Sequence, residues 1–118
     1  SDIDVVELCF SGVFLVDPED VDFWAEKVRQ QLAYLARPVE VLLDLGGFRV
    51  KPSAAQRFGE VRASLWHDLA LATYRFGADG WTATAVRTSS VLHSAEDNLF
   101  PSREEALAAL LRDREQRD

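Results

Sequence analysis

The sequence predicts an α/β fold in which about four helices pack on a mixed, mainly parallel sheet of four to five strands. Three observations support this prediction. Strand-like and helix-like segments alternate along the chain, residues 39–45 are almost continuously apolar, and two segments open with strong helix-start signals. Such alternation is typical of parallel sheets whose strands are joined by right-handed helical crossovers. We expect one domain that spans residues 1–118.

The first strand is expected at residues 5–10, because alternation places Val6, Leu8 and Phe10 on one face. Asp17 is expected to cap the helix that follows, and Pro18 suits its first position, where a backbone donor is not needed. Apolar residues then recur at intervals of three and four, which predicts a helix through about residue 36. They are Val21, Trp24, Val28, Leu32 and Leu35.

Residues 39–45 are the expected central strand, because a nearly continuous apolar run suits a strand covered by helices on both faces. A second helix is expected over residues 53–66. Its buried side carries Ala54, Phe58, Val61 and Leu65. Residues 69–76 follow as the next strand, so the order up to this point is strand, helix, strand, helix, strand.

Residues 80–93 admit two interpretations. Asp79 would cap a helix that carries Trp81, Ala85, Thr88 and Leu92 inward, whereas the same residues would also suit a strand paired with the previous one. We favour the helix because it continues the alternation. Both interpretations remain open on the residues alone.

The C-terminal part of the chain carries a clearer signal. Residues 98–100 are expected to form a brief edge strand. Ser102 and Glu105 have the spacing of a capping box ahead of a final helix. The charged residues 112–118 are expected to fray into solvent.

Composition argues against several classes of function. The formal net charge is −7, and phosphate repels an acidic protein, so nucleic-acid binding is not expected. Cys9, His67 and His93 are too few for an ordinary zinc site, and no cofactor is expected. No stretch approaches the roughly 20 apolar residues of a membrane span, and the start lacks a signal-peptide pattern. We therefore expect a cytoplasmic protein without membrane insertion.

The sequence contains no recognisable enzyme motif. Gly46 and Gly47 lack the further glycine of a dinucleotide site and the lysine of a phosphate loop. Cys9 is expected to be a small, half-buried residue within its strand. A small hydrolase that uses Ser53 or Ser11 with a histidine remains an alternative, and it requires these side chains to lie within hydrogen-bond reach. We expect no catalytic activity.

Basic side chains surround Ser53 in the sequence, with only Glu60 opposing them. They are Arg49, Lys51, Arg57 and Arg62. Such a group is either a solvated face or a docking surface for an acidic partner or a phosphate. Because Ser53 opens a predicted helix, a phosphate on it would be stabilised by the positive helix end. Ser53 is therefore the candidate phosphoacceptor, and the four basic residues are candidates for partner binding.

Four segments together resemble a known family. They are residues 41–48 (VLLDLGGF), a helix that begins near Ser53, residues 69–74 (LALATY) and residues 100–110 (FPSREEALAAL). They look like a STAS domain of the SpoIIAA-like group, the bacterial anti-sigma-factor antagonists. The resemblance extends from about residue 5 to residue 111 and implies a compact α/β sandwich.

The resemblance also implies a function. Antagonists of this group bind a protein partner, an anti-sigma factor or kinase-like regulator, and here the loop and helix near Ser53 would do so. Their central strand leads into Asp-Leu-Ser-x-Val-x-x-Ile-Asp-Ser, whose last serine is phosphorylated. Aligning Asp44 with that motif places Ser53 at the phosphoacceptor, while Gly46, Lys51 and Pro52 replace its first serine, isoleucine and second aspartate.

Two further expectations accompany this one. STAS-like chains are also compared with SEC14-type lipid carriers, so the alternative function is a small-ligand or lipid-binding module with an apolar cavity. Short edge strands and exposed helix faces often associate, which makes a homodimer a further expectation.

Overall fold

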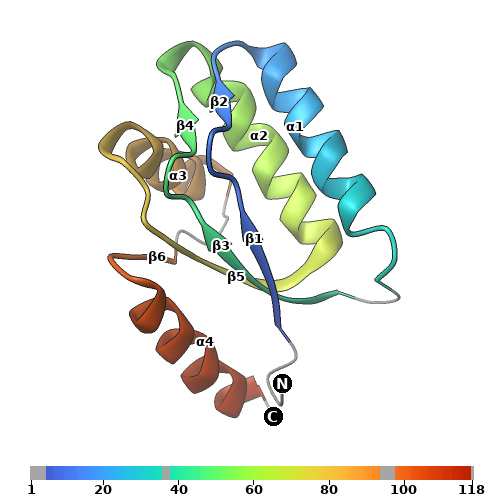
Figure 1. Ribbon diagram of the computed structural model, residues 1–118, viewed down its shortest axis with the longest axis vertical. Helices are drawn as coiled ribbons and strands as arrows, with labels where there is room; N and C mark the ends of the chain where they lie inside the picture. The colour runs from blue at the N-terminus through green and yellow to red at the C-terminus, as the bar shows by residue number, and fades with distance from the viewer. Residues whose placement is uncertain (1–4, 36–37, 94–97, 118) are drawn as a thin grey trace.

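A computed structural model describes the backbone of residues 5–35, 38–93 and 98–117. Four parallel strands form the main sheet in the order β1-β3-β5-β6, and two short parallel strands form a separate ribbon, β2-β4 (Figure 1). The strands are β1 (Val5–Cys9), β2 (Phe14–Leu15), β3 (Val39–Asp44), β4 (Arg49–Val50), β5 (Ala70–Phe76) and β6 (Leu99–Phe100). The helices are α1 (Pro18–Gln31), α2 (Pro52–Leu69), α3 (Gly80–His93) and α4 (Arg103–Arg117). The predicted α/β class is confirmed.

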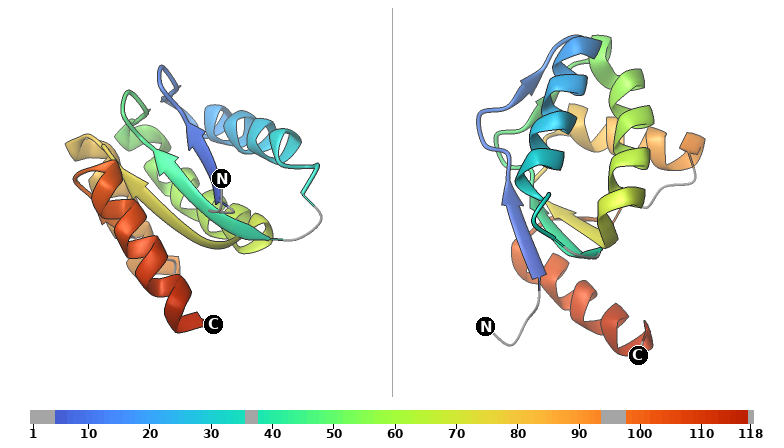
Figure 2. Two further views of the ribbon diagram at one scale, coloured as in Figure 1. Left: turned by 60° about the horizontal axis from the view of Figure 1, so that its bottom comes forward. Right: turned by 90° about the vertical axis from the view of Figure 1, so that its right-hand side faces the viewer.

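The sheet separates two layers of helices. Helices α1, α2 and α3 cover one face and α4 covers the other (Figure 2). Val41 and Leu43 of β3 join the larger core under the three helices, whereas Leu42 joins the smaller core under α4. Strand β3 is therefore interior and buried on both faces, as its apolar run predicts.

Helix α1 begins as predicted. The Oδ1 of Asp17 accepts a hydrogen bond from the backbone N–H of Asp20 at 3.0 Å, and the Asp20 carboxylate accepts from the N–H of Asp17 at 3.3 Å. The predicted end near residue 36 is wrong, because the helix ends at Gln31. Leu32 still packs into the core from a following turn, in which the N–H of Leu35 donates to the carbonyl of Leu32. A turn preserves the spacing of three residues, so apolar spacing alone overextends the helix.

Residues 80–93 form a helix, which settles the open alternative, and Ala85 is buried as predicted, but the rest of the described part of its predicted inward face is wrong. Trp81 is 68% exposed and Thr88 is exposed, whereas Thr82 is fully buried. The hydroxyl of Thr82 donates to the carbonyl of Phe48 and accepts from the N–H of Val50, both at 3.2 Å. These two bonds to the β4 segment hold Thr82 inward, so the buried face of the helix starts one residue later than predicted. The side chains of Leu92 and His93 lie outside the described residues.

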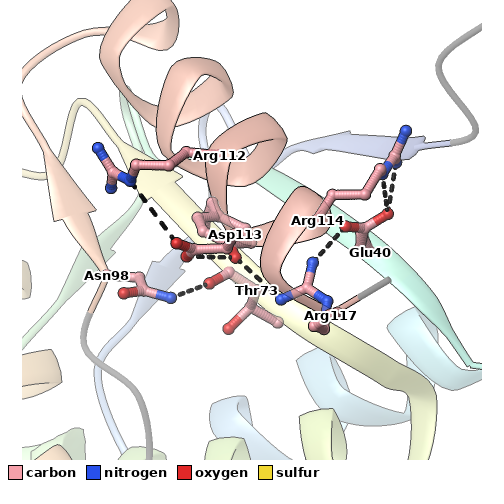
Figure 3. Close-up of polar contacts among 8 residues, drawn as sticks. Glu40, Thr73, Asn98, Arg112, Asp113, Arg114 and Arg117 are labelled. Carbon is pink, nitrogen blue, oxygen red and sulfur yellow. Dashed lines mark hydrogen bonds and ion pairs between the residues drawn. The ribbon is translucent and has the colours of Figure 1, made fainter.

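Helix α4 starts with the predicted cap, in which the N–H of Glu105 donates to Ser102 Oγ at 3.3 Å. The prediction that residues 112–118 fray is wrong, because the helix continues to Arg117. Arg114 and Arg117 both donate to the carboxylate of Glu40, a buried residue of β3 (Figure 3). This network on the sheet holds the charged end of the helix in place.

The structure also tests the predicted burial of Cys9 and of the tryptophan side chains. Cys9 is exposed at the end of β1 and not half-buried. Trp24 lies in the larger core, where its ring meets Phe10 edge-on at a centroid distance of 5.6 Å. Trp66 is likewise buried, whereas Trp81, which the sequence predicts to point inward, is exposed.

Candidate interaction surface

The ribbon β2-β4 stands beyond the carboxyl ends of β1 and β3 (Figure 1). The N–H of Arg49 donates to the carbonyl of Val13, and the N–H of Lys51 donates to the carbonyl of Leu15, both at 2.9 Å. Leu15 and Val50 point into the core, so their neighbours Phe14 and Arg49 point outward. Each strand is only two residues long, and long-range bonds therefore define the ribbon more than local pattern does.

Glycine permits the chain to enter both strands of the ribbon. Gly12 and Gly47 have φ values of +81° and +78°, which residues with a side chain rarely adopt. The N–H of Gly12 donates to the carbonyl of Gly47 at 3.0 Å. A Cβ atom on Gly47 would lie 3.1 Å from the Oγ of Ser11. The close approach of these two turns explains Gly47, whereas a Cβ atom on Gly46 would lie 3.1 Å from Oδ1 of Asp44.

Helix α2 starts at the end of the ribbon. Lys51 is its N-cap with φ −76° and ψ 154°, the extended conformation that a following proline imposes. Pro52 takes the first helical position, and the first turn contains no acidic residue. Ser53 is exposed, and its hydroxyl donates to the carbonyl of Val16, which follows β2. The start of α2 is thereby joined to the ribbon.

The outward face of the ribbon combines apolar and basic side chains. Phe14 is 57% exposed, and the guanidinium of Arg49 lies 5.9 Å from the centre of its ring. Val16 follows Phe14 by two residues and Lys51 follows Arg49 by two, so both lie on the same outward face. Both are exposed. Trp81 is exposed in the first turn of α3, two residues after Asp79, which forms an ion pair with Arg49. We call this set the ribbon surface: Phe14, Val16, Arg49, Lys51, Ser53 and Trp81.

Three of the four predicted basic residues lie on or near this surface, and ion pairs engage two of them. Arg49 Nε is 3.6 Å from Asp79. Arg57 Nε donates to Asp22 Oδ1 at 2.8 Å, and the Asp22 carboxylate raises the pKa of the Arg57 guanidinium. Lys51 is exposed and forms no ion pair within the described part of the chain. The surface is thus less basic than the sequence suggests.

Arg62 is not a surface residue, which corrects the fourth prediction. It is only 2% exposed, and its Nη1 donates to the Oγ of Ser89 in α3 at 2.8 Å. Arg62 follows Phe58 by four residues and precedes Leu65 by three, so it belongs to the buried stripe of α2. It joins α2 to α3 and is unavailable to a partner.

Sequence reasoning missed Phe14, Val16 and Trp81. A signal existed for the first two, because Val13-Phe14-Leu15-Val16 directly follows a turn glycine and could have been tested for alternation. Trp81 had no comparable signal, since threonine and alanine dilute the periodicity of its helix. Exposed aromatic side chains next to arginine are typical of protein interfaces.

The structure does not bring Ser53 to His67. Ser53 lies in the first turn of α2 and His67 in its last turn, about 20 Å apart at the helical rise per residue. Ser11 lies beside Gly47 at the ribbon end of the molecule, also away from His67. The side chain of His93 lies outside the described residues. No hydrolytic arrangement is therefore visible between either serine and His67.

A groove of about 310 Å³ separates the outer sides of α1 and α2. Its lining is mostly charged and consists of Asp22, Ala25, Glu26, Arg29, Arg57, Glu60, Val61 and Ser64. This lining does not suit a lipid chain, because burying an apolar chain among charges would desolvate them. Within the described residues, no cluster of three histidine, cysteine or acidic residues has the arrangement of a metal site.

Comparison with known proteins finds no matching family model, no similar curated protein and no similar solved structure. Among the described helices, none is both long and apolar enough to cross a membrane.

Proposed function

We propose that this chain is a cytoplasmic, noncatalytic interaction domain, similar to the STAS-type anti-sigma-factor antagonists, that binds a protein partner through the ribbon surface. The observation that supports this proposal is that exposed Phe14 lies under the guanidinium of Arg49 just before α2, while Asp79, the ion-pair partner of Arg49, stands two residues before exposed Trp81. Contiguous exposed apolar patches often mark interaction sites, and aromatic residues and arginine are enriched among the residues that contribute most to binding. An anti-sigma factor or kinase-like regulator is the partner class that the family resemblance implies.

Phosphorylation of Ser53 is the regulatory part of the proposal. The Ser53 hydroxyl donates to the carbonyl of Val16, and a phosphoester oxygen has no proton to donate. Phosphate would therefore break the bond that joins α2 to the ribbon. It would also place nearly two negative charges between Lys51 and the positive end of α2. Both effects alter the surface that the partner contacts.

The test is affinity capture from the source organism, followed by quantitative mass spectrometry. The ribbon variant carries Phe14→Ser and Arg49→Glu. The matched control carries Leu111→Ser and Arg112→Glu on exposed positions of α4, on the opposite side of the sheet. The proposal expects a partner retained by wild type and control but lost by the ribbon variant. Equal capture by all three proteins would overturn it.

The regulatory part has its own test. Phosphopeptide analysis of the native protein should find phosphate on Ser53, and Ser53→Asp should weaken capture of the same partner more than Ser53→Ala, which loses the hydrogen bond to Val16 but gains no charge. An unmodified Ser53 together with unchanged capture by Ser53→Asp would remove regulation and leave the binding surface in place. Within the described residues, the groove between α1 and α2 is charged and therefore does not favour the small-ligand or lipid alternative.

A further inference from the structure

Helix α4 is attached to the sheet through little apolar surface. Its buried side chains are two alanines and one leucine, Ala106, Ala109 and Leu110. Hydrophobic stabilisation grows with the apolar area removed from water, and an alanine side chain contributes a single methyl group. Helices α1 and α2, on the other face, bury large rings such as Trp24 and Phe58. The apolar attachment of α4 is therefore weaker than theirs.

The two faces of the sheet are also packed separately. Helix α2 packs against both α1 and α3, so these three helices support one another, whereas α4 packs on β3, β5 and β6 (Figure 2). The larger core and the smaller core share no buried residue among those described. Removal of α4 from the sheet would therefore leave the larger core closed.

Ionic contacts hold α4 at both ends. Near its start, Arg103 donates to the Glu7 carboxylate of β1 through Nη2 at 2.8 Å and Nε at 3.1 Å. Near its end, Arg114 donates to the Glu40 carboxylate through Nε at 2.9 Å, and Arg117 donates to the same carboxylate (Figure 3). The pair at the start is half-exposed, whereas the Glu40 side chain is buried.

These contacts cost little to break when the whole helix leaves the sheet. An exposed ion pair adds little to stability. At the other end, departure of α4 uncovers Glu40 and carries the arginines into water, and the Tyr74 hydroxyl and its acceptor Asp113 are hydrated as well. This hydration offsets much of the lost attraction. Substitution of the arginines is different, because it leaves the carboxylate buried without its cations.

We propose that α4 is a detachable cover, which leaves the sheet as one unit while the remainder of the domain stays folded. Its departure uncovers an apolar face on the adjacent strands β3 and β5, formed by Leu42, Ala72, Tyr74 and Phe76. Each of these residues is at most 9% exposed while α4 is in place. The ionic contacts at the two ends of α4 set how often the cover opens. This device does not depend on the ribbon surface, which lies beyond the carboxyl ends of β1 and β3.

Native-state hydrogen exchange tests whether α4 opens separately. Amides of residues 107–111, in the middle of α4, are compared with those of residues 58–66 in α2, after correction for intrinsic exchange rates. The middle of each helix is used because helix ends fray. The α4 amides should share one protection factor, at least about tenfold below that of α2. Equal protection in the two helices would overturn the proposal, because α4 would then open only with the whole domain.

Charge reversal tests the ionic contacts. Arg114→Glu with Arg117→Glu places two further carboxylates beside Glu40 and should speed exchange in α4 by at least about a hundredfold, without changing exchange in α2. A dye that fluoresces on exposed apolar surface should bind this variant and not wild type. The matched control is Arg87→Glu with Arg112→Glu, which makes the same change of charge at exposed positions and should exchange like wild type.

Two results with the reversal variant would contradict the proposal: exchange in α4 at the wild-type rate, or an equal rise in α2. If that variant does not fold, Arg103→Ala decides, because it removes only the half-exposed pair with Glu7. Exchange in α4 should then rise about two- to fivefold, and exchange in α2 should not change. No rise in α4, or the same rise in both helices, would show that α4 is not a separate cover.

Discussion

The hydroxyl of Ser53 donates a hydrogen bond to the carbonyl of Val16, across 37 positions of sequence. This contact joins the first turn of α2 to the segment that follows β2, so a change at Ser53 is transmitted to the ribbon. Ser53 is exposed, and this contact also gives its hydroxyl a structural role. A site with both properties is suited to regulation, because modification is sterically possible and has a structural consequence.

Ser53→Ala should lower the free energy of unfolding by about 0.5–1.5 kcal/mol, since one side-chain hydrogen bond is lost. Urea denaturation followed by circular dichroism measures the change. Ser64→Ala is the control, because Ser64 is an exposed residue of the same helix, and it should stay within about 0.5 kcal/mol of wild type. Equal effects of the two variants would argue against a structural role for the Ser53 hydroxyl.

Arg62 and Arg57 should differ in what their loss costs. Arg62 is buried between α2 and α3, and Arg62→Ala leaves a cavity and removes the hydrogen bond to the Ser89 hydroxyl, so we expect a loss of about 2–4 kcal/mol. Arg57 is exposed, and Arg57→Ala should change the unfolding free energy little. Partner capture should be unchanged in a folded Arg62→Lys protein. A reversed order of the two stabilities would place Arg62 at the surface.

In the network under α4, removing the two arginines should lower the free energy of unfolding more than neutralising Glu40. The side chain of Glu40 is 8% exposed, whereas those of Arg114 and Arg117 are 26% and 33% exposed. Replacing both arginines by alanine strands a buried carboxylate and should cost about 3–5 kcal/mol. Glu40→Gln leaves arginines that can reach water and should cost only about 1–3 kcal/mol.

Arg112→Ala is the control for this pair of variants, because Arg112 is exposed and contacts only its neighbour Asp113 among the charges described. It should change the unfolding free energy by less than about 0.5 kcal/mol. If Glu40→Gln costs more than the double arginine variant, the buried carboxylate is not the costly group and the account of α4 docking fails.

Tyr74 should make stability fall at alkaline pH. Its hydroxyl donates to Asp113 at 2.8 Å, and burial raises its pKa above the ordinary value of 10.0. The folded state therefore holds this proton more tightly than the unfolded state does. The stability from this group is complete below the ordinary pKa and is lost as pH rises through the raised one. Urea unfolding at several alkaline pH values should show this loss for wild type, and Tyr74→Phe should lack it.

Much of the fold follows from local sequence signals. The Asp17-Pro18 start of α1 and the interior strand β3 depend on capping and on a long apolar run, which neighbouring residues alone determine. Even the choice of helix for residues 80–93 follows from the alternation of elements. Its rotation does not, because Thr82 is drawn inward by Phe48 and Val50, more than 30 residues earlier.

The candidate site is less predictable for the same reason. Ser53 at an exposed helix start follows from local pattern and is confirmed as exposed. Phe14 acquires its exposure only because β2 pairs with β4, a contact between segments 35 residues apart. Arg62 carries a charge that suggests the surface, yet its spacing within α2 decides its burial. The charge of Arg62 favours an exposed position and its spacing favours a buried one, and the spacing determines where it lies.

The most direct test of the central claim is hydrogen exchange of the chain alone and in complex with its captured partner. If the ribbon surface is the contact, peptides that cover residues 13–16 and 49–57 should exchange more slowly in the complex, while α4 should be unchanged. Slower exchange confined to α4 or to the α1–α2 groove, with the ribbon unaffected, would contradict the claim.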